Sequence, residues 1–248
     1  MKTNIVITDL TRMYRGMVCI AGYDAKHRCI RPTLPPPGIS EKALFFEEQP
    51  IIFPFAVVEF DLLEQTPEPP HTEDQQFDPK SPRFLREVIN RQQVLDWSLF
   101  ENITEIFEQP INTDFGYYVM DCQGVRSLGT IRPVSIVKVI YEKDMGGAWD
   151  YRLHFTDGNG DFYRLKITDL TWQYYCQSKR GPDLTPAQVS EGLTDILHSS
   201  EVYLRIGLAR RWKKFPDRCY LQLNGIYTFP DYLDGKIFAE LITQDRKT

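Results

Sequence analysis

The sequence predicts a mainly β protein with inserted helices (β/α+β), folded as two small β-barrels packed in one chain. Aromatic residues make up 13% of the 248 residues, and the 15 Phe and 13 Tyr favour strands over helical bundles. The 17 Pro and 15 Gly supply the many turns that short strands require. The phrase Ile-Thr-Asp-Leu-Thr occurs at residues 7–11 and again at 167–171, and such self-similarity predicts two related β units. Chance recurrence of common strand and turn residues explains the repeat equally well.

The first half is expected to contain four strands. β-Branched and aromatic residues concentrate in four runs, at residues 3–8, 17–22, 28–32 and 53–63. The acidic, proline-rich run at 65–82 predicts a long surface loop. Ser81 and Pro82 have the order of a helix N-cap and a first helical residue, so a helix is expected to run through Arg91, with another near 97–107.

The second half is expected to contain six strands and one long helix. The strand candidates lie at residues 116–120, 130–141, 151–156, 161–168, 202–209 and 219–229. The Asp-Gly-Asn-Gly run at 157–160 favours a hairpin turn because Gly and Asn tolerate positive φ. Thr185, Pro186 and Gln188 form a capping box with proline at the first helical position, which predicts a helix ending near His198.

A helix between three strands and two further strands is the element order of the oligonucleotide/oligosaccharide-binding (OB) barrel, which has five strands. That order fits the second half, and it fits the first half less cleanly. We therefore predict a first OB-like barrel at 1–112, with the acidic proline-rich loop and a helical insertion, and a second at 113–248 with the helix at 186–198.

Apolar runs and cysteines bear on location and on metal binding. No apolar run approaches the roughly 20 residues that cross a bilayer, so no membrane partner is expected. The first residues lack the pattern of a secretion signal, which makes a cytoplasmic location the expectation. The five cysteines are odd in number and none are spaced Cys-x-x-Cys, which predicts reduced thiols rather than a zinc site. No metal and no cofactor are predicted.

The net charge of −5 hides an uneven distribution along the chain. Residues 1–31 carry six Lys/Arg and two acids, and residues 205–218 carry six Lys/Arg and one acid. Residues 41–78 carry ten acids and one Lys. An acidic protein of this kind is able to present a basic face, although an ordinary solvated surface explains each run taken alone.

The clearest candidate binding segment is the basic linker at 210–215, Arg-Arg-Trp-Lys-Lys-Phe, which lies between two predicted strands. Phosphate contacts are expected from its four cations, Arg210, Arg211, Lys213 and Lys214. Trp212 is expected to stack on a base, an interaction worth about 1–3 kcal/mol. The alternative is a solubilising loop with Trp212 folded into the core.

Arg31 and Arg132 form a second candidate pair, because each precedes a proline in a recurring Ile-Arg-Pro phrase. If the halves are duplicated, the two arginines occupy related places near each barrel mouth. The alternative is that each pairs with a carboxylate such as Asp9 or Asp169. The basic face would be extended by three residues near the N-terminus, Arg12, Arg15 and Lys26.

The best candidate for chemistry is His71, which titrates near neutral pH and has Glu73 and Asp74 beside it to orient the ring. No Ser or Cys nucleophile can be assigned next to it, and a turn capped by its own side chains is the simpler interpretation. Asp9 and Asp169 are each expected to accept backbone hydrogen bonds in a turn rather than to hold a metal. The common phosphate-loop, dinucleotide, zinc-protease and serine-hydrolase motifs are absent from the sequence, so a non-enzymatic role is predicted.

The order of several short motifs resembles a known family, the bacterial dual OB-containing domain (DuOB). The motifs are Val-Cys-Ile-Ala-Gly-Tyr at 18–23, Cys-Ile-Arg-Pro at 29–32, Pro-Pro-His-Thr-Glu-Asp at 69–74, Tyr-Leu-Arg-Ile-Gly-Leu-Ala-Arg at 203–210 and Leu-Asn-Gly-Ile-Tyr-Thr-Phe-Pro-Asp-Tyr at 223–232. The resemblance spans nearly the whole chain. It implies two OB-like barrels and a nucleic-acid or nucleotide role, often in prokaryotic conflict or defence, and it brings no catalytic residues.

Together these observations predict a non-enzymatic module that binds nucleic acid, either a single strand or an exposed end. A second hypothesis is a nucleotide or small-ligand sensor, in which the acidic 41–78 segment closes over one barrel face. A third is a protein–protein adaptor for a partner encoded nearby, since the acidic segment and proline-rich loops suit such a role.

Overall fold

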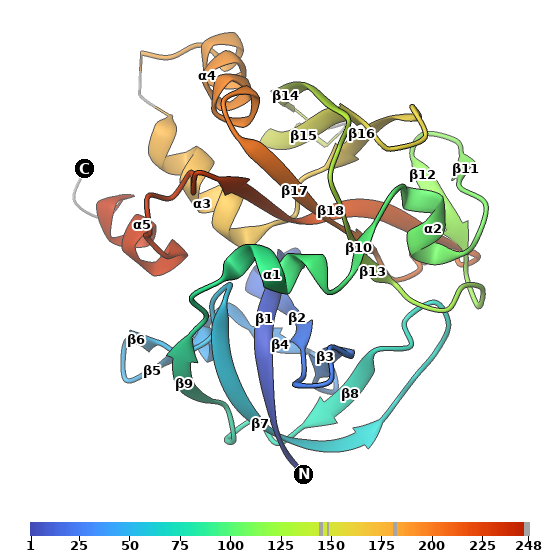
Figure 1. Cartoon of the computed structure of the whole chain (residues 1–248), viewed down its shortest axis with the longest axis vertical. Coiled ribbons are helices and arrows are strands. Elements are labelled where there is room, and N and C mark those ends of the chain that lie inside the picture. The colour runs from blue at the N-terminus through green and yellow to red at the C-terminus, as the bar shows by residue number, and fades with distance from the viewer. Residues whose placement is uncertain (144–145, 148, 181–182, 246–248) are drawn as a thin grey trace.

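The protein forms two β units, one above the other in Figure 1, with helices at their junction and on the outside of the upper unit. The structure is a computed structural model that describes residues 1–143, 146–147, 149–180 and 183–245. No helix in these ranges has the length and apolar character needed to cross a membrane.

The first half is a closed barrel of five strands. In order around the ring they are β1 (Lys2–Arg12), β2 (Met17–Tyr23), β3 (Cys29–Thr33), β8 (Asp74–Phe77) and β7 (Ala56–Gln65). β1 closes the ring because it pairs with β7 through its first residues and with β2 through the rest. A register shift between Ile7 and Asp9 lets this one strand bend between its two neighbours. β3 and β8 run parallel, and all other neighbours are antiparallel.

The second half is a half-barrel made of two sheets. In one sheet β17 (Glu201–Leu208) pairs with β13 (Leu128–Ile131) and with β18 (Arg218–Phe229). The other sheet contains β14 (Ser135–Lys143), β15 (Trp149–Thr156) and β16 (Phe162–Lys166). The chain runs from β13 to β14 at one side, whereas a single parallel bridge between Ile167 and Leu223 joins the sheets at the other.

Both halves have the same strand order when β13 and β14 are treated as one bent first strand. In each, the first strand pairs with the second and the fourth, and the third runs parallel to the fifth. The prediction of a mainly β chain with two OB-like units is therefore confirmed. The more complete barrel is the first one, where the sequence pattern fitted less cleanly. The boundary between residues 112 and 113 stays a prediction, and Ile103, Ile106 and Phe107 pack into the core of the second half.

Smaller elements connect the strands. In the first half they are η1 (Tyr14–Gly16), β4 (Ile39–Ser40), η2 (Glu41–Leu44), β5 (Phe45–Phe46), β6 (Gln49–Pro50) and β9 (Arg83–Glu87). Further along they are α1 (Arg91–Asp96), β10 (Leu99–Phe100), α2 (Ile103–Phe107), β11 (Asn112–Thr113) and β12 (Tyr117–Met120). The remaining helices are α3 (Leu170–Lys179), α4 (Pro186–His198) and α5 (Phe238–Asp245). The capping box of α4 is present as predicted, with Thr185 and Gln188 bonded reciprocally.

Three expectations about local structure are wrong. Residues 83–87 form strand β9, which pairs with β7, and the helix begins only at Arg91. The predicted surface loop at 65–82 contains β8, an integral barrel strand. Residues 167–169 follow the end of β16 and α3 begins at Leu170, whereas residues 7–11 lie inside β1, so the repeated phrase does not mark equivalent positions.

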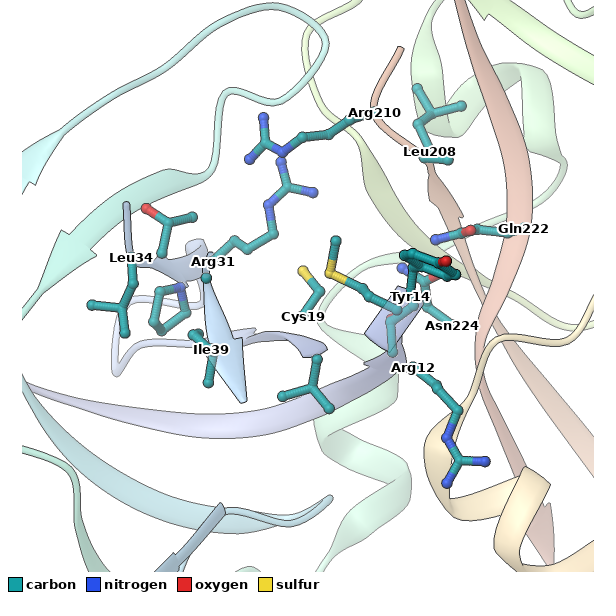
Figure 2. Close-up of a pocket in the computed structure, with 17 residues that line it drawn as sticks. Arg12, Tyr14, Cys19, Arg31, Leu34, Ile39, Leu208, Arg210, Gln222 and Asn224 are labelled. Atoms are coloured by element: carbon teal, nitrogen blue, oxygen red, sulfur yellow. The ribbon is translucent and has the colours of Figure 1, made fainter. Parts of the chain in front are cut away.

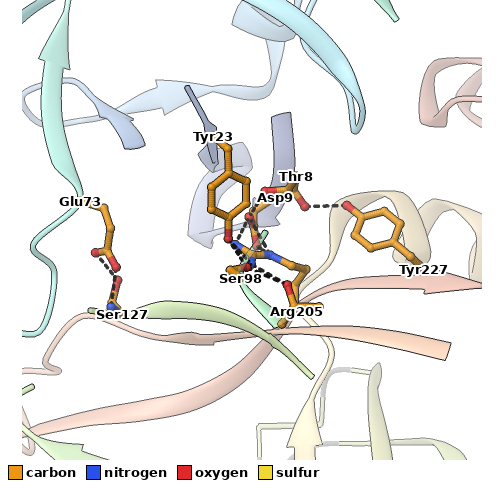
Figure 3. Close-up of polar contacts among 9 residues, drawn as sticks. Thr8, Asp9, Tyr23, Glu73, Ser98, Ser127, Arg205 and Tyr227 are labelled. Carbon is orange, nitrogen blue, oxygen red and sulfur yellow. Dashed lines mark hydrogen bonds and ion pairs between the residues drawn. The ribbon is translucent and has the colours of Figure 1, made fainter. Parts of the chain in front are cut away.

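A buried ion pair joins the two halves (Figure 3). Arg205 in β17 and Asp9 in β1 are both inaccessible to solvent, and Arg205 Nη2 lies 2.8 Å from Asp9 Oδ2. The other guanidinium nitrogen, Nη1, donates to Tyr23 Oη at 2.7 Å and to two hydroxyls, of Ser98 and Thr130. The charged group thus keeps a full set of partners, as a buried charge requires.

Apolar contacts and two further polar contacts support the same junction. A cluster at the junction combines Tyr23 and Phe55 from the first barrel, Val94 and Leu95 from α1, and Tyr203 and Tyr227 from the second half. Tyr227 Oη donates to the Thr8 carbonyl oxygen at 2.6 Å (Figure 3). Glu73 accepts from the backbone nitrogen and the hydroxyl of Ser127, at 2.6 and 2.9 Å (Figure 3). The halves are therefore joined by a shared apolar cluster and by hydrogen bonds between buried groups.

His71 is part of this junction and is not an exposed acid–base group. Its ring is 4% exposed, and Nε2 lies 3.2 Å from the Leu208 carbonyl oxygen of the second half. Burial, reinforced by the positive charges of Arg31 and Arg210, lowers the pKa of His71 to about 3. The imidazole is neutral at physiological pH and acts as a structural hydrogen-bonding group.

Replacing Asp9 with Asn should destabilise the protein strongly. The change leaves the Arg205 charge buried without its counter-ion, which costs about 3–5 kcal/mol of unfolding free energy. Glu59→Gln is the control, because the cationic partners of Glu59, Lys2 and Arg83, are exposed; its cost should stay below about 1 kcal/mol. Urea denaturation followed by circular dichroism measures both, and equal effects of the two substitutions would contradict the assigned role of Asp9.

His71 should make folding stability fall in acid. Its pKa is lower in the folded protein than the usual value of 6.5 in the unfolded chain, so between those values the unfolded chain binds the additional proton. Its stabilising contribution is complete above pH 6.5 and is lost as the pH falls toward 3. The stability difference between wild type and His71→Gln should shrink by roughly 3 kcal/mol from pH 7 to pH 4, as measured by urea denaturation. Parallel pH curves for the two proteins would show that the ring is not held neutral.

Candidate nucleic-acid interface

Two adjoining hollows lie where the halves meet. The first, of about 370 Å³, lies between strands β1 to β3 of the first barrel and β17 and β18 of the second half (Figure 2). The second, of about 520 Å³, is lined by β14, β15, β16 and α3. Both are lined by Arg12, Met13 and Tyr14, the segment that leads from β1 into η1. The hollows are therefore neighbours across one exposed turn.

Two arginines from different halves meet at the first hollow and share one carboxylate. Arg31 in β3 lies beside Asp74 in the parallel strand β8, and its Nε is 2.6 Å from Asp74 Oδ1. Arg210, which follows β17, pairs with the other oxygen, Oδ2. Figure 2 shows the two guanidinium groups next to each other. Asp74 is thus the ion-pair partner of both cations, while the neighbouring Glu73 acts on Arg31 through its charge and is hydrogen-bonded to Ser127.

The rest of the first hollow is uncharged apart from Arg12. Cys19 faces it, and burial raises the pKa of that thiol, which therefore stays protonated. The amide side chains of Gln222 and Asn224 line the side formed by β18, and Leu34 and Ile39 line the opposite side (Figure 2). The hollow thus combines concentrated positive charge with amide donors and an apolar wall.

The second hollow contains a stack of three aromatic rings. Tyr141 lies between Trp149 and Tyr151, with ring centroids 4.5 and 4.6 Å away. The indole of Trp149 is half exposed. Two cations border the stack: Arg180 donates to Tyr141 Oη at 2.7 Å, and Lys166 lies 3.0 Å from Asp150. Sequence reasoning missed this stack, because the predicted hairpin joins residues 151–156 to 161–168, whereas the stack depends on the pairing of β14 with β15, which sets Tyr141 opposite Tyr151.

The β17–β18 connection is exposed and includes most of the predicted basic linker. Trp212 is 55% exposed and packs against Phe215 at the loop surface, so it is not part of the core. Lys213 and Lys214 are also exposed, and the ammonium of Lys214 lies over the indole. Arg211 is bound to Asp121 at 2.9 Å. The loop therefore presents an aromatic ring together with two exposed lysines, close in sequence to Arg210.

The predicted cations do not all converge. Arg12 lines both hollows, and Arg15 lies next to them in η1 with its guanidinium over the Tyr14 ring. Arg132, in contrast, pairs with Glu201 at the start of β17, while Arg210 follows its end. Since this strand of eight residues is about 26 Å long, Arg132 lies far from Arg210, and it lines neither hollow. The expectation that Arg31 and Arg132 occupy related places is wrong. Arg31 lies in the third strand of the first barrel, whereas Arg132 lies between β13 and β14, at the bend of the first strand of the second half.

The groups proposed for chemistry are engaged in structural contacts. His71 and Glu73 tie the halves together, and Asp74 holds the two arginines. Asp169 caps α3 by accepting from the backbone nitrogens of Thr171 and Trp172. Within the ranges that the structure describes, no three His, Cys, Asp or Glu side chains gather as metal ligands would.

The comparison with known proteins agrees with this architecture. The family model of the dual OB-containing domain matches residues 3–226, which includes both β units and both hollows. No curated protein matches the chain. The strand order of the two halves and the extent of this match lead to one assignment: the chain belongs to the dual OB-containing domain family.

Proposed function

We propose that this protein is a non-enzymatic module that binds single-stranded nucleic acid along the two hollows. The observation that carries the proposal is that the two hollows adjoin each other. The hollow lined by arginines and the hollow lined by stacked aromatic rings share the Arg12–Tyr14 turn as part of their lining. Proteins that bind single strands use this combination, a positive groove that follows the phosphates and rings on which bases stack.

The charges are placed for phosphate contacts. Five cations line the hollows: Arg12, Arg31, Lys166, Arg180 and Arg210. Arginine pairs with phosphate oxygens through two parallel hydrogen bonds, whereas lysine contributes a point charge. Lys213 and Lys214 extend the positive surface at one end. The net charge of −5 does not oppose this, because attraction depends on the local field of the groove.

The rings are placed for base stacking. Tyr14 is 82% exposed at the shared turn, and Trp149 lines the second hollow. Trp212 is exposed in the β17–β18 connection, two residues after Arg210, which lines the first hollow. In OB folds, oligonucleotides bind to the face of the second and third strands and to the loops after the first and fourth strands. Trp149 and Lys166 belong to strands in those places, and Tyr14 and Trp212 belong to such loops. The groove uses the surfaces that OB barrels offer to ligands.

A nucleotide sensor is the second candidate, because the first hollow alone has the volume of a small-ligand site. The acidic lid expected for it is not available, since residues 41–78 include barrel strands β7 and β8. A role in prokaryotic conflict or defence remains an expectation from the family resemblance. A cytoplasmic location and a protein partner encoded nearby remain expectations from the sequence.

Binding should weaken steeply with salt. If four phosphates are contacted, the slope of log affinity against log salt is about −2.8, or about a 50-fold loss between roughly 50 and 200 mM salt. Fluorescence anisotropy with labelled 20-mers of deoxythymidine and of uridine measures the slope. The double variant Lys213→Ala/Lys214→Ala should flatten it by about 1.4, while Lys80→Ala/Arg86→Ala, which removes exposed cations remote from both hollows, should not. If neither the deoxythymidine nor the uridine 20-mer binds at low salt, the proposal is overturned.

Trp212→Ala should weaken strand binding without affecting folding. Loss of one stacked base costs about 1–3 kcal/mol, which is roughly a 5- to 150-fold lower affinity. The matched control is Phe46→Ala, which removes an exposed ring of the first barrel that lines neither hollow. Affinity is read by anisotropy and folding by thermal melting. An equal effect of both substitutions would exclude stacking on Trp212.

A further inference from the structure

We infer that the cluster of Arg31, Asp74 and Arg210 binds a phosphate monoester at the end of a nucleic-acid strand. The inference rests on the proposed function, and it names the chemical group that the first hollow receives. A monoester offers three terminal oxygens and carries about −1.5 to −2 charges near pH 7, more than an internal phosphodiester.

The first support is an unused donor on a buried arginine. Arg31 is 4% exposed, and its Nε is bonded to Asp74. Its Nη2 is also buried, and among the described residues it has no hydrogen-bond acceptor. A buried charged donor without an acceptor is costly, so an anionic oxygen entering the hollow would recover that energy.

The second support is the charge balance of the cluster. Two guanidinium groups share the single carboxylate of Asp74. The charge of the neighbouring Glu73 also acts on Arg31, but the oxygens of Glu73 accept from Ser127 and not from either arginine. The adjacent His71 is neutral at physiological pH, because burial lowers its pKa to about 3, and the Cys19 thiol is protonated. Neither of these two neighbours is negatively charged, and in the part of the chain that the structure describes Asp74 is the one carboxylate in an ion pair with Arg31 or Arg210. Charge-assisted hydrogen bonds from two arginines are the usual way of holding a phosphate group.

The third support is the shape of the hollow. Next to Arg31 its wall is formed by Pro32, Leu34 and Ile39, which offer no charged partner for a further phosphate (Figure 2). On the opposite side, Arg12 and Tyr14 connect it to the second hollow. A strand is therefore able to leave toward the aromatic stack, and its phosphate-bearing end would lie at Arg31.

The test compares one oligonucleotide in three forms, with a 5′-phosphate, with a 3′-phosphate and with hydroxyls at both ends. Anisotropy should show at least tenfold tighter binding of one phosphorylated form. Arg210→Gln should reduce this preference to less than threefold. Arg211→Gln is the matched control, because Arg211 is adjacent, similarly exposed and paired with Asp121; it should leave the ratio unchanged. Arg31→Lys, with folding checked by thermal melting, keeps the charge but removes the planar fork, and it should also reduce the preference.

The outcomes separate this inference from the proposed function. Equal binding of all three forms, with salt-dependent affinity retained, would overturn the end-phosphate site and leave strand binding intact. Binding of adenosine monophosphate as tight as that of the phosphorylated strand would overturn the assignment to a strand end, because the site would then hold a free nucleotide. Loss of all strand binding at low salt would overturn both.

Discussion

The arrangement of the whole molecule depends on the buried pair of Asp9 and Arg205. Asp9 lies at the register shift of β1, and three residues later the same strand reaches Arg12, which lines both hollows. Arg205 lies in β17, and five residues later the chain reaches Arg210. The pair therefore fixes the relative position of the two segments that border the first hollow. A groove made from two barrels keeps its shape only if such a contact prevents the barrels from sliding.

The buried ion pair is better explained by its effect on how the two halves dock than by a gain in folding stability. Removing two charges from water is expensive, and a well-packed apolar pair of similar volume is often at least as stable. The ion pair adds a geometric requirement, because the guanidinium must bond to Asp9, to Tyr23 and to the hydroxyl of Thr130 at the same time. Few other docking arrangements satisfy all of these groups. The apolar cluster around α1 then supplies burial energy that favours contact without fixing its register.

The sequence predicts those elements whose signals are local. Prediction fails where contact with a residue distant in the sequence determines the secondary structure. The capping box at Thr185 and Gln188 is self-contained, and its helix ends where predicted. Ser81-Pro82 resembles a helix start, yet the Ser81 hydroxyl donates to the Asp78 carbonyl oxygen in a turn. The residues that follow form β9, because they pair with β7. The repeated Thr-Asp-Leu-Thr phrase shows the same limit. Asp169 caps a helix with its carboxylate, whereas Asp9 is engaged by Arg205 from the other half.

The candidate site also combines a feature that local sequence predicts with features that depend on residues distant in the sequence. The basic loop at 210–214 was found from composition, because a run of cations between two strands needs no distant partner to be recognised. Its value as a binding surface depends on pairing, which composition does not reveal. Asp121 neutralises Arg211 and Glu201 neutralises Arg132, whereas Asp74 must serve both Arg31 and Arg210. That sharing follows from the parallel register of β3 and β8, which only the closed barrel defines. A chain with a net negative charge thus brings two guanidinium groups to one shared carboxylate, where an anion would complete the cluster.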